Sequence, residues 1–320
     1  MRARRSTVSD GTDDVWGRIA ARLAPGASVL RSWDLAGGLS SAMTVLDVRI
    51  GDGSVQRVVV RRARRPGGSA LAVPDEYRLL TRLHAAGLAV PRPRLLDDSG
   101  TILPLPYAVL DFVEGAPRFT TDAPERTGRA FAARLAAIHD VDPSVADGAG
   151  LRLRAAATDR LLAEPLAVLD DGLQEGSIRE ALRAHRARLH SGPVRLLHGD
   201  LWPGNVLWAG DDIVAVIDWQ SATLGDPLAD LAVSRLDLLW AFGPDALTAF
   251  TAGYAAHRPV DRTALPVWDL VAALRPAGSL SAWAADWADF GRPDVTSATM
   301  RAAHRWFVDR ALAELAGSGG

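Results

Sequence analysis

The sequence contains neither cysteine nor lysine. Without cysteine the protein can form no disulfide, no thiolate nucleophile and no thiolate-ligated metal site. All 36 residues counted as lysine or arginine are therefore arginine. This excludes the Gly-Lys-Ser/Thr loop of P-loop nucleoside triphosphatases, and it makes arginine the only permanently charged side chain available to bind a phosphate group.

Long apolar runs and an excess of positive charge are also missing. No apolar stretch approaches the ~18 residues of a membrane-spanning helix. The segment Met1–Asp14 is polar and lacks the apolar core of a signal peptide. A net charge of -2 and a pI of about 6.4 do not suit a basic nucleic-acid binder. We therefore expect a cytoplasmic protein without a membrane or nucleic-acid partner, and the sequence leaves its oligomeric state open.

Two domains are expected from the length, because 320 residues exceed the usual domain size of about 150 residues. The first third is rich in short strands. Leu46–Ile50 and Arg57–Val60 are apolar and β-branched and flank a Gly-Asp-Gly-Ser turn, which predicts an antiparallel pair. A helix is expected over Pro74–Gly87, and a buried strand over Tyr107–Val113.

The rest of the chain has mainly helical patterns. Phe131, Leu135 and Ile138 are spaced for one face of a helix. A Glu-Gly-Ala-Pro hinge precedes them, so we expect an N-terminal lobe over residues 1–113 and a C-terminal lobe over residues 114–320. The other elements expected here are helices over Leu161–Leu169, over Ile178–Leu189 and from about Pro227 onward, and a hairpin of Val206–Trp208 with Ile213–Ile217.

Three oxygen-bearing side chains follow short apolar strands in the middle of the C-terminal half. Asp200 lies in a tight loop after an apolar strand, and Asn205 stands five residues later, where the next strand begins. Asp218 closes the strand after that. Carboxylate and amide oxygens are hard ligands that suit magnesium, which usually binds one or two carboxylates together with substrate phosphates. The spacing therefore indicates a magnesium and phosphate site.

These motifs resemble the aminoglycoside phosphotransferase family. The residues that carry the resemblance are His-Gly-Asp200-x4-Asn205, Ile-Asp218-Trp and Gly-Asp-Pro-x2-Asp230. The resemblance implies an α+β, protein-kinase-like bilobal fold with a small antiparallel-sheet N-lobe and a larger, mainly helical C-lobe. It implies Mg²⁺-dependent transfer of the γ-phosphoryl group of ATP or GTP to a hydroxyl of a small molecule. By position, Asp200 is the catalytic base or orients the acceptor hydroxyl, and Asn205 and Asp218 hold the metal.

The same resemblance assigns supporting roles to other residues of these motifs. Asp226 and Asp230 match family positions that fix the metal loop and the helix after it. His198 is expected to brace the catalytic loop rather than to act as a base. His139, at the end of an earlier helix, is expected to pack or cap.

The resemblance also implies a nucleotide site in the N-terminal lobe. The family's phosphate-covering loop corresponds to Leu35–Ala42, in which glycine and serine let backbone N–H groups approach phosphate oxygens. Arg61 stands where the fold has a phosphate-binding lysine on its third strand, and Glu76 is its expected ion-pair partner. The residues assigned to the nucleotide site are Gly38, Ser40, Ser41, Arg61 and Glu76, with the backbone of Asp111 and Val113 for the purine.

Other kinase classes fit the sequence less well. A protein kinase carries His-Arg-Asp, Asp-Phe-Gly and Ala-Pro-Glu with an activation segment between them. Here only seven positions separate Asp218 from Gly225, which leaves no room for such a segment. A protein or lipid kinase is therefore a weaker alternative. A nucleotide-binding pseudokinase with a regulatory role is favoured only by the arginine at position 61, and the intact acidic motifs argue against it.

The acceptor pocket is expected in the helices after Ala232. Residues 231–320 contain nine acidic side chains and eight arginines, which gives a net charge of -1. This charge does not indicate a pocket for a polycationic acceptor. Aromatic faces beside carboxylates can bind a sugar ring or an organic cation, although tryptophans at helical spacing also pack cores. Macrolides, aminoglycosides, amino alcohols and free sugars all remain open. The candidate acceptor residues are Asp237, Trp240, Trp283, Asp286 and Trp287.

Overall fold

The structure is a computed structural model that describes residues 12–35, 41–64, 71–164, 169–189 and 191–317. The chain forms two compact units, each built from separate segments of the sequence. The first contains Met1–Ala116, Val145–Leu151 and Leu207–Ser221, and the second contains Pro117–Ser144, Arg152–Val206 and Ala222–Gly320. The single domain boundary expected between residues 113 and 114 stays a prediction.

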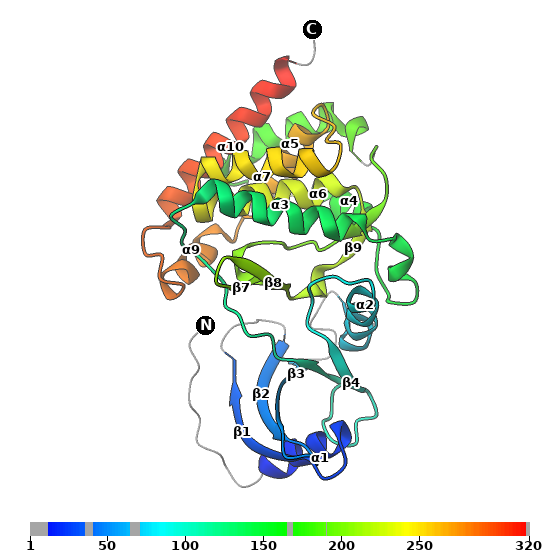
Figure 1. The fold of residues 1–320 in the computed structure, drawn as a ribbon. Coiled ribbons are helices and arrows are strands. Elements are labelled where there is room, and N and C mark those ends of the chain that lie inside the picture. The colour runs from blue at the N-terminus through cyan, green and yellow to red at the C-terminus, as the bar shows by residue number, and fades with distance from the viewer. Residues whose placement is uncertain (1–11, 36–40, 65–70, 165–168, 190, 318–320) are drawn as a thin grey trace. The chain divides into compact units, whose positions relative to one another are not determined.

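The first unit is built on an antiparallel sheet of five strands in the order β1-β2-β3-β5-β4 (Figure 1). The predicted strand pair is confirmed: β2 and β3 pair over their whole length, with Leu46 opposite Val58. These two residues, with Val48 and Val60, are buried in the core of the unit. The strands are β1 (Ser28–Asp34), β2 (Ser41–Arg49), β3 (Val55–Ala63), β4 (Pro93–Asp97) and β5 (Tyr107–Asp111).

Two helices belong to this unit. In α1 (Thr12–Leu23), which the sequence analysis did not predict, Trp16 and Ile19 are buried in the same core as the strands. The helix expected over Pro74–Gly87 is confirmed as α2 (Val73–Ala85). Pro74 is its second residue, and Gly87 follows the helix with a φ of +83°, a left-handed conformation that glycine adopts without strain.

The predicted hairpin is confirmed as β7 (Val206–Ala209) and β8 (Asp212–Val216). From Leu207 onward its residues belong to the first unit. Trp208 exchanges backbone hydrogen bonds with Ala116, and the backbone N–H of Val216 donates to the carbonyl of Ala89 at 2.8 Å. The hairpin is thus tied to the unit at both ends.

The second unit is mainly helical, with a two-stranded sheet of β6 (Arg195–Leu197) and β9 (Thr223–Gly225). Helices α3 and α7 pack closely, because Gly128 of α3 leaves room for the backbone of Ala246. Phe131, Leu135 and Ile138 are buried, as predicted. The helices are α3 (Pro124–Asp140), α4 (Arg154–Ala163), α5 (Glu175–Ala184), α6 (Pro227–Phe242), α7 (Pro244–His257), α8 (Leu265–Ala273), α9 (Leu280–Asp289) and α10 (Ser297–Gly317).

Two helix predictions in this unit were wrong in their extent. The helix expected over Leu161–Leu169 is the end of α4, which stops at Ala163 because Glu164 precedes a proline and leaves the helical region. The helix expected over Ile178–Leu189 ends at Ala184. After Leu182 the next positions on its apolar face are His185 and Arg186, and the chain continues as a short 3₁₀ turn.

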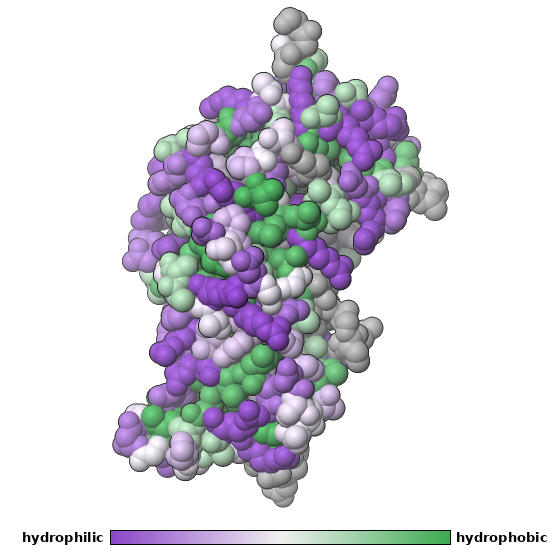
Figure 2. All heavy atoms as spheres, turned by 90° about the vertical axis from the view of Figure 1, so that its right-hand side faces the viewer, coloured by the Kyte–Doolittle hydropathy of each residue, from purple (hydrophilic) through white to green (hydrophobic). Residues whose placement is uncertain are grey.

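Each unit encloses its own buried core. On the face drawn in Figure 2, hydrophilic side chains cover much of the surface, and apolar side chains gather in groups between them. Among the helices of the described residues, none combines the length and the apolar character needed to cross a membrane. The apolar helices α6 and α8 are instead buried along almost their entire length. The loop after β6 is bonded to α6 through Asp230 and Ser234.

Candidate active site

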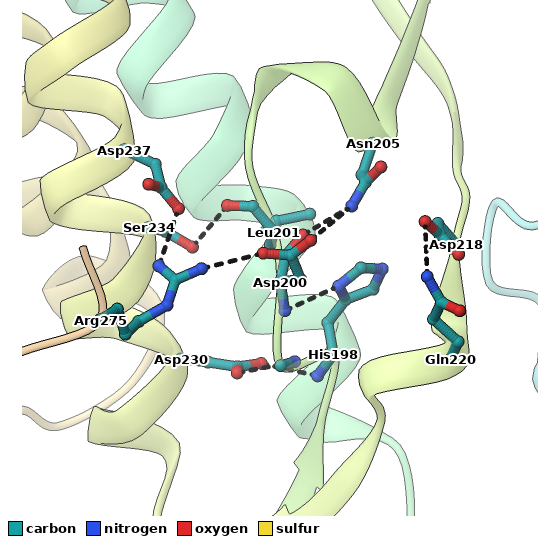
Figure 3. Close-up of polar contacts among 11 residues, drawn as sticks. His198, Asp200, Leu201, Asn205, Asp218, Gln220, Asp230, Ser234, Asp237 and Arg275 are labelled. Carbon is teal, nitrogen blue, oxygen red and sulfur yellow. Dashed lines mark hydrogen bonds and ion pairs between the residues drawn. The ribbon is translucent and has the colours of Figure 1, made fainter. Parts of the chain in front are cut away.

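The loop after β6 is held by one buried carboxylate from the first turn of α6. The two oxygens of Asp230 accept hydrogen bonds from the backbone N–H groups of His198, at 2.6 Å, and Gly199, at 2.9 Å (Figure 3). Gly199 has a φ of +83°, which favours glycine at this bend. Burial alone would raise the pKa of Asp230, but the hydrogen bond and charge of His139 and the charges of His198 and Arg154 outweigh it, so the pKa is lowered.

Both carboxylate oxygens of Asp200 accept hydrogen bonds. One carboxylate oxygen accepts from Nδ2 of Asn205 at 3.2 Å, and the other accepts from Arg275 at 3.0 Å. Its backbone N–H donates to Nδ1 of His198 at 3.2 Å, so His198 braces the loop as expected. Nδ2 of Asn205 also donates to the carbonyl of Asp200 at 2.9 Å, which turns the amide oxygen of Asn205 away from Asp200 (Figure 3).

In the first unit a buried arginine joins two acidic residues. Arg61 donates from Nε to Glu76 at 2.7 Å and from a terminal nitrogen to Asp218 at 3.2 Å. The ion pair expected between Arg61 and Glu76 is therefore present. Burial would lower the pKa of Arg61, but the charges of Glu76 and Asp218 raise it. Burial, aided by the charge of Asp218, raises the pKa of Glu76 although Arg61 opposes this.

Asp218 is held in a conformation that few residues other than glycine adopt, with a φ of +64°. The next residue, Trp219, is fully buried and donates from its ring nitrogen to the carbonyl of Val216 at 3.1 Å. One oxygen of Asp218 accepts from Arg61, and the other accepts from Gln220 at 3.3 Å. The backbone and two donors thus fix the direction of this carboxylate.

The other residues assigned to nucleotide binding have mixed outcomes. Gly38 and Ser40 lie outside the described residues. Ser41, expected in a loop, is instead the buried first residue of β2, because its backbone pairs with Ala63 of β3. The backbone N–H of Asp111 donates to the carbonyl of Arg92 at 2.8 Å. Val113 lies two residues beyond the end of β5 and is half-buried.

Three of the candidate acceptor residues gather around Arg275. Asp237 accepts from Arg275 at 3.2 Å, and the Arg275 guanidinium lies over the ring of Trp283, 5.8 Å from its centre. The ring of Trp283 in turn lies 6.3 Å from that of Trp240. Burial, together with the charge of Asp200, raises the pKa of Asp237 to about 6 although Arg275 opposes this.

The other two candidates do not join this group. Trp287 is buried in a separate aromatic cluster with Phe119, Trp202 and Phe290. Asp286 is exposed, because α9 turns its tryptophans inward and leaves Asp286 at the surface. The alternation of acid and aromatic in the sequence therefore does not correspond to one pocket.

Comparison with known proteins decides the family. The model of the phosphotransferase enzyme family that includes the aminoglycoside phosphotransferases matches residues 38–274. The chain belongs to this family. A homoserine kinase of Methylocella silvestris is 33% identical over 224 residues, a match that covers 64% of this chain and 67% of that enzyme.

Solved structures of phosphotransferases have the same fold. A macrolide 2'-phosphotransferase of Brachybacterium faecium is 25% identical, with a TM-score of 0.56 over 94% of this chain and 98% of that one. A phosphotransferase solved with GDP and kanamycin is 16% identical, with a TM-score of 0.62 over 93% of this chain and 98% of that one. The predicted α+β, kinase-like fold is confirmed, and the chain is a small-molecule phosphotransferase of this family.

The sequence analysis missed two arginines of this phosphotransferase. Arg275 contacts Asp200 from 75 positions away in the sequence, just after α8. Arg154, at the start of α4, acts electrostatically on Asp200, Asp230 and Arg275. Neither lies in a motif, and no local pattern marks them among 36 basic residues. The only signal was indirect, since a buried Asp237 requires a cation beside it.

Proposed function

We propose that this phosphotransferase moves the γ-phosphoryl group of ATP or GTP to a hydroxyl of a small molecule, with Asp200 orienting that hydroxyl. The observation that supports the proposal most directly is that Asn205 and Arg275 donate hydrogen bonds to the two carboxylate oxygens of Asp200. The acceptor oxygen bonds to the γ-phosphorus while the bond from the γ-phosphorus to the β,γ-bridging oxygen breaks. The hydroxyl proton passes to Asp200, and the nucleoside diphosphate leaves. Such a reaction depends mostly on positioning and electrostatics.

Arg61 takes the part of the phosphate-binding cation. Its guanidinium is held by Glu76 and Asp218 through two of its nitrogens, and we assign the remaining nitrogen to a phosphate oxygen. A planar guanidinium that is fixed at two points loses little freedom when a phosphate binds. The backbone of Asp111 and Val113 would receive the purine. Gly38, Ser40 and Ser41 stay predicted phosphate contacts, and of these only Ser41, at the start of β2, lies within the described residues.

Asp218 and Asn205 have the donor chemistry for magnesium. One offers a carboxylate and the other an amide oxygen that is turned away from Asp200, and Mg²⁺ completes its coordination with phosphate oxygens and water. When bound, the metal neutralises negative charge on the transferring phosphoryl group. Asp218 belongs to the first compact unit and Asn205 to the second.

The experiment is nucleoside diphosphate release with MgATP or MgGTP and a panel of acceptors. The panel contains homoserine, kanamycin, a macrolide, simple sugars and amino alcohols. We expect release that depends on one acceptor class and that falls by about 10²–10⁴-fold in Asp200→Asn, as is typical when a general base is removed. Nucleotide binding should survive this substitution.

Two results would contradict the proposal. Full turnover by Asp200→Asn would remove Asp200 from the reaction. Tight MgATP binding without Asp200-dependent release for any acceptor would instead favour a nucleotide-binding regulatory protein. Transfer to casein or to lipid vesicles in the same assay would reveal a protein or lipid kinase.

A further inference from the structure

Arg275 is one cation shared by two carboxylates. It donates to Asp200 at 3.0 Å and to Asp237 at 3.2 Å, and its side chain is 21% exposed. Charge-assisted hydrogen bonds of this kind are strong and directional. Any acceptor whose hydroxyl reaches Asp200 must therefore come within reach of the Arg275 guanidinium.

A second arginine, Arg154, interacts electrostatically with Asp200 and Arg275, and one of its hydrogen-bond donors has no partner among the described residues. Nε of Arg154 is buried and has no hydrogen-bond partner among the residues that the structure describes. The side chain is packed close to the backbone of β9, since a Cβ at Gly225 would lie 2.7 Å from Cβ of Arg154. Arginine keeps its charge at any ordinary pH, and a buried donor without an acceptor is unfavourable.

The nearby carboxylates are already engaged. Asp230 accepts from the backbone of His198 and Gly199, and Asp200 accepts from Asn205 and Arg275. Burial and the like charge of Arg275 lower the pKa of Arg154, although Asp230 and Asp200 oppose this. Arg154 thus lies within electrostatic range of Asp200 and Arg275, and its buried Nε is the donor that an additional anionic group would satisfy.

We infer that the acceptor of this enzyme carries a carboxylate close to its reacting hydroxyl, and that Arg154 and Arg275 bind this carboxylate. The inference rests on the proposed function and names its substrate class, small hydroxy carboxylates. A guanidinium pairs with a carboxylate through two parallel hydrogen bonds. A polycationic acceptor would instead bring positive charge next to both arginines, while Asp237 and Asp200 are already paired with Arg275.

The experiment compares acceptors that differ only in the carboxylate. L-Homoserine is paired with 3-amino-1-propanol, and 4-hydroxybutanoate with 1-propanol, so that each pair presents the same primary hydroxyl. The measured quantity is the ratio of kcat/KM within a pair. We expect the carboxylate member to be preferred by about 10- to 100-fold, the range of charge-assisted hydrogen bonds, mainly through KM.

Substitutions test whether Arg154 causes the preference for the carboxylate. In the acceptor pair with the larger kcat/KM ratio, Arg154→Gln should reduce that ratio by about tenfold. Arg154→Lys, which keeps the charge, should recover part of the ratio. Arg310→Gln is the matched control, because Arg310 is exposed on α10 and forms its ion pair with the equally exposed Glu314. Its ratio should equal that of the wild type. Equal thermal unfolding temperatures verify that the variants are folded.

Three results would overturn the inference. They are equal or better use of the carboxylate-free member by the wild-type enzyme, a preference that Arg154→Gln leaves intact, and turnover confined to kanamycin, macrolides or sugars. In each case Asp200-dependent release would still support the proposed function. If no acceptor gives Asp200-dependent release, the proposed function fails and the inference falls with it.

Discussion

Arg61 lies on β3, and protein kinases carry their phosphate-binding lysine on the third strand. Glu76 and Asp218 both bind the Arg61 guanidinium. Arg61 and Glu76 have side chains that are 7% and 4% exposed. An ion pair so deeply buried contributes little net stability as a pair, but the loss of one member leaves the other buried and uncompensated.

Glu76→Ala should therefore lower the free energy of unfolding by about 3 kcal/mol or more, the usual loss when one member of a buried pair is removed. Arg78→Ala is the control on the same helix, because Arg78 is half exposed and pairs with Asp75 at the surface. Exposed pairs contribute about 0.2–1 kcal/mol. Urea unfolding of both variants measures the difference, and equal small losses would show that the buried pair is not a structural unit.

At the scale of elements, the helix pair α3 and α7 fixes the scaffold of the second unit. The backbones approach so closely that a Cβ at Gly128 would lie 2.3 Å from the carbonyl oxygen of Ala246 and 3.0 Å from the backbone nitrogen of Phe250. Backbone atoms cannot move aside as a flexible side chain can. The glycine is thus required by packing, against its low helix propensity.

Gly128→Ala should accordingly destabilise the protein by about 1–3 kcal/mol, the range for overpacking a core. Gly176→Ala should have the opposite sign, because Gly176 lies in α5 with open space around its Cβ position, and alanine favours a helix by up to about 1 kcal/mol. Thermal unfolding of the two variants should show a lower unfolding temperature for Gly128→Ala and a higher one for Gly176→Ala than for the wild type. A stabilised Gly128→Ala would show that α3 and α7 do not pack as described.

The helices and strands also show which features of the sequence were sufficient to predict an element. The β2–β3 pair and the β7–β8 hairpin have local patterns and short turns, so both were predicted. α1 was missed although Trp16 and Ile19 begin a helical apolar face, a readable signal. Arg275 and Arg154 could not be predicted, because tertiary packing alone brings them to Asp200. The family motifs named Asp200 and Asn205, but the local contacts of these residues required the structure.

At the scale of the whole molecule, the absence of lysine concentrates pH dependence in the carboxylates and the seven histidines. Arginine does not titrate in the range where proteins are stable. Among the carboxylates of the described residues, Asp237 has a pKa raised from 3.8 to about 6. Between these two pH values the folded protein holds a proton at Asp237 that the unfolded chain has released, so stability falls as the pH rises through this window.

Asp237→Asn should remove this pH dependence. The variant should match the wild-type slope below about pH 4 and gain relative stability as the pH rises to about 6, where the difference becomes constant. Asp286→Asn, at an exposed carboxylate, is the control and should run parallel to the wild type. Thermal unfolding temperatures from pH 4 to 8 measure the effect. A variant curve parallel to the wild type throughout would contradict the assigned pKa.

The family membership, the braced Asp200 loop and the Arg61 cluster all lead to one central claim, which is Asp200-dependent transfer of a phosphoryl group to a small-molecule hydroxyl. The measurement that tests it most directly is ³¹P NMR of the reaction mixture with MgATP and the best acceptor. We predict one new phosphomonoester for each nucleoside diphosphate formed, and its absence in Asp200→Asn. Inorganic phosphate as the only new product, or the same ester from Asp200→Asn, would contradict the account.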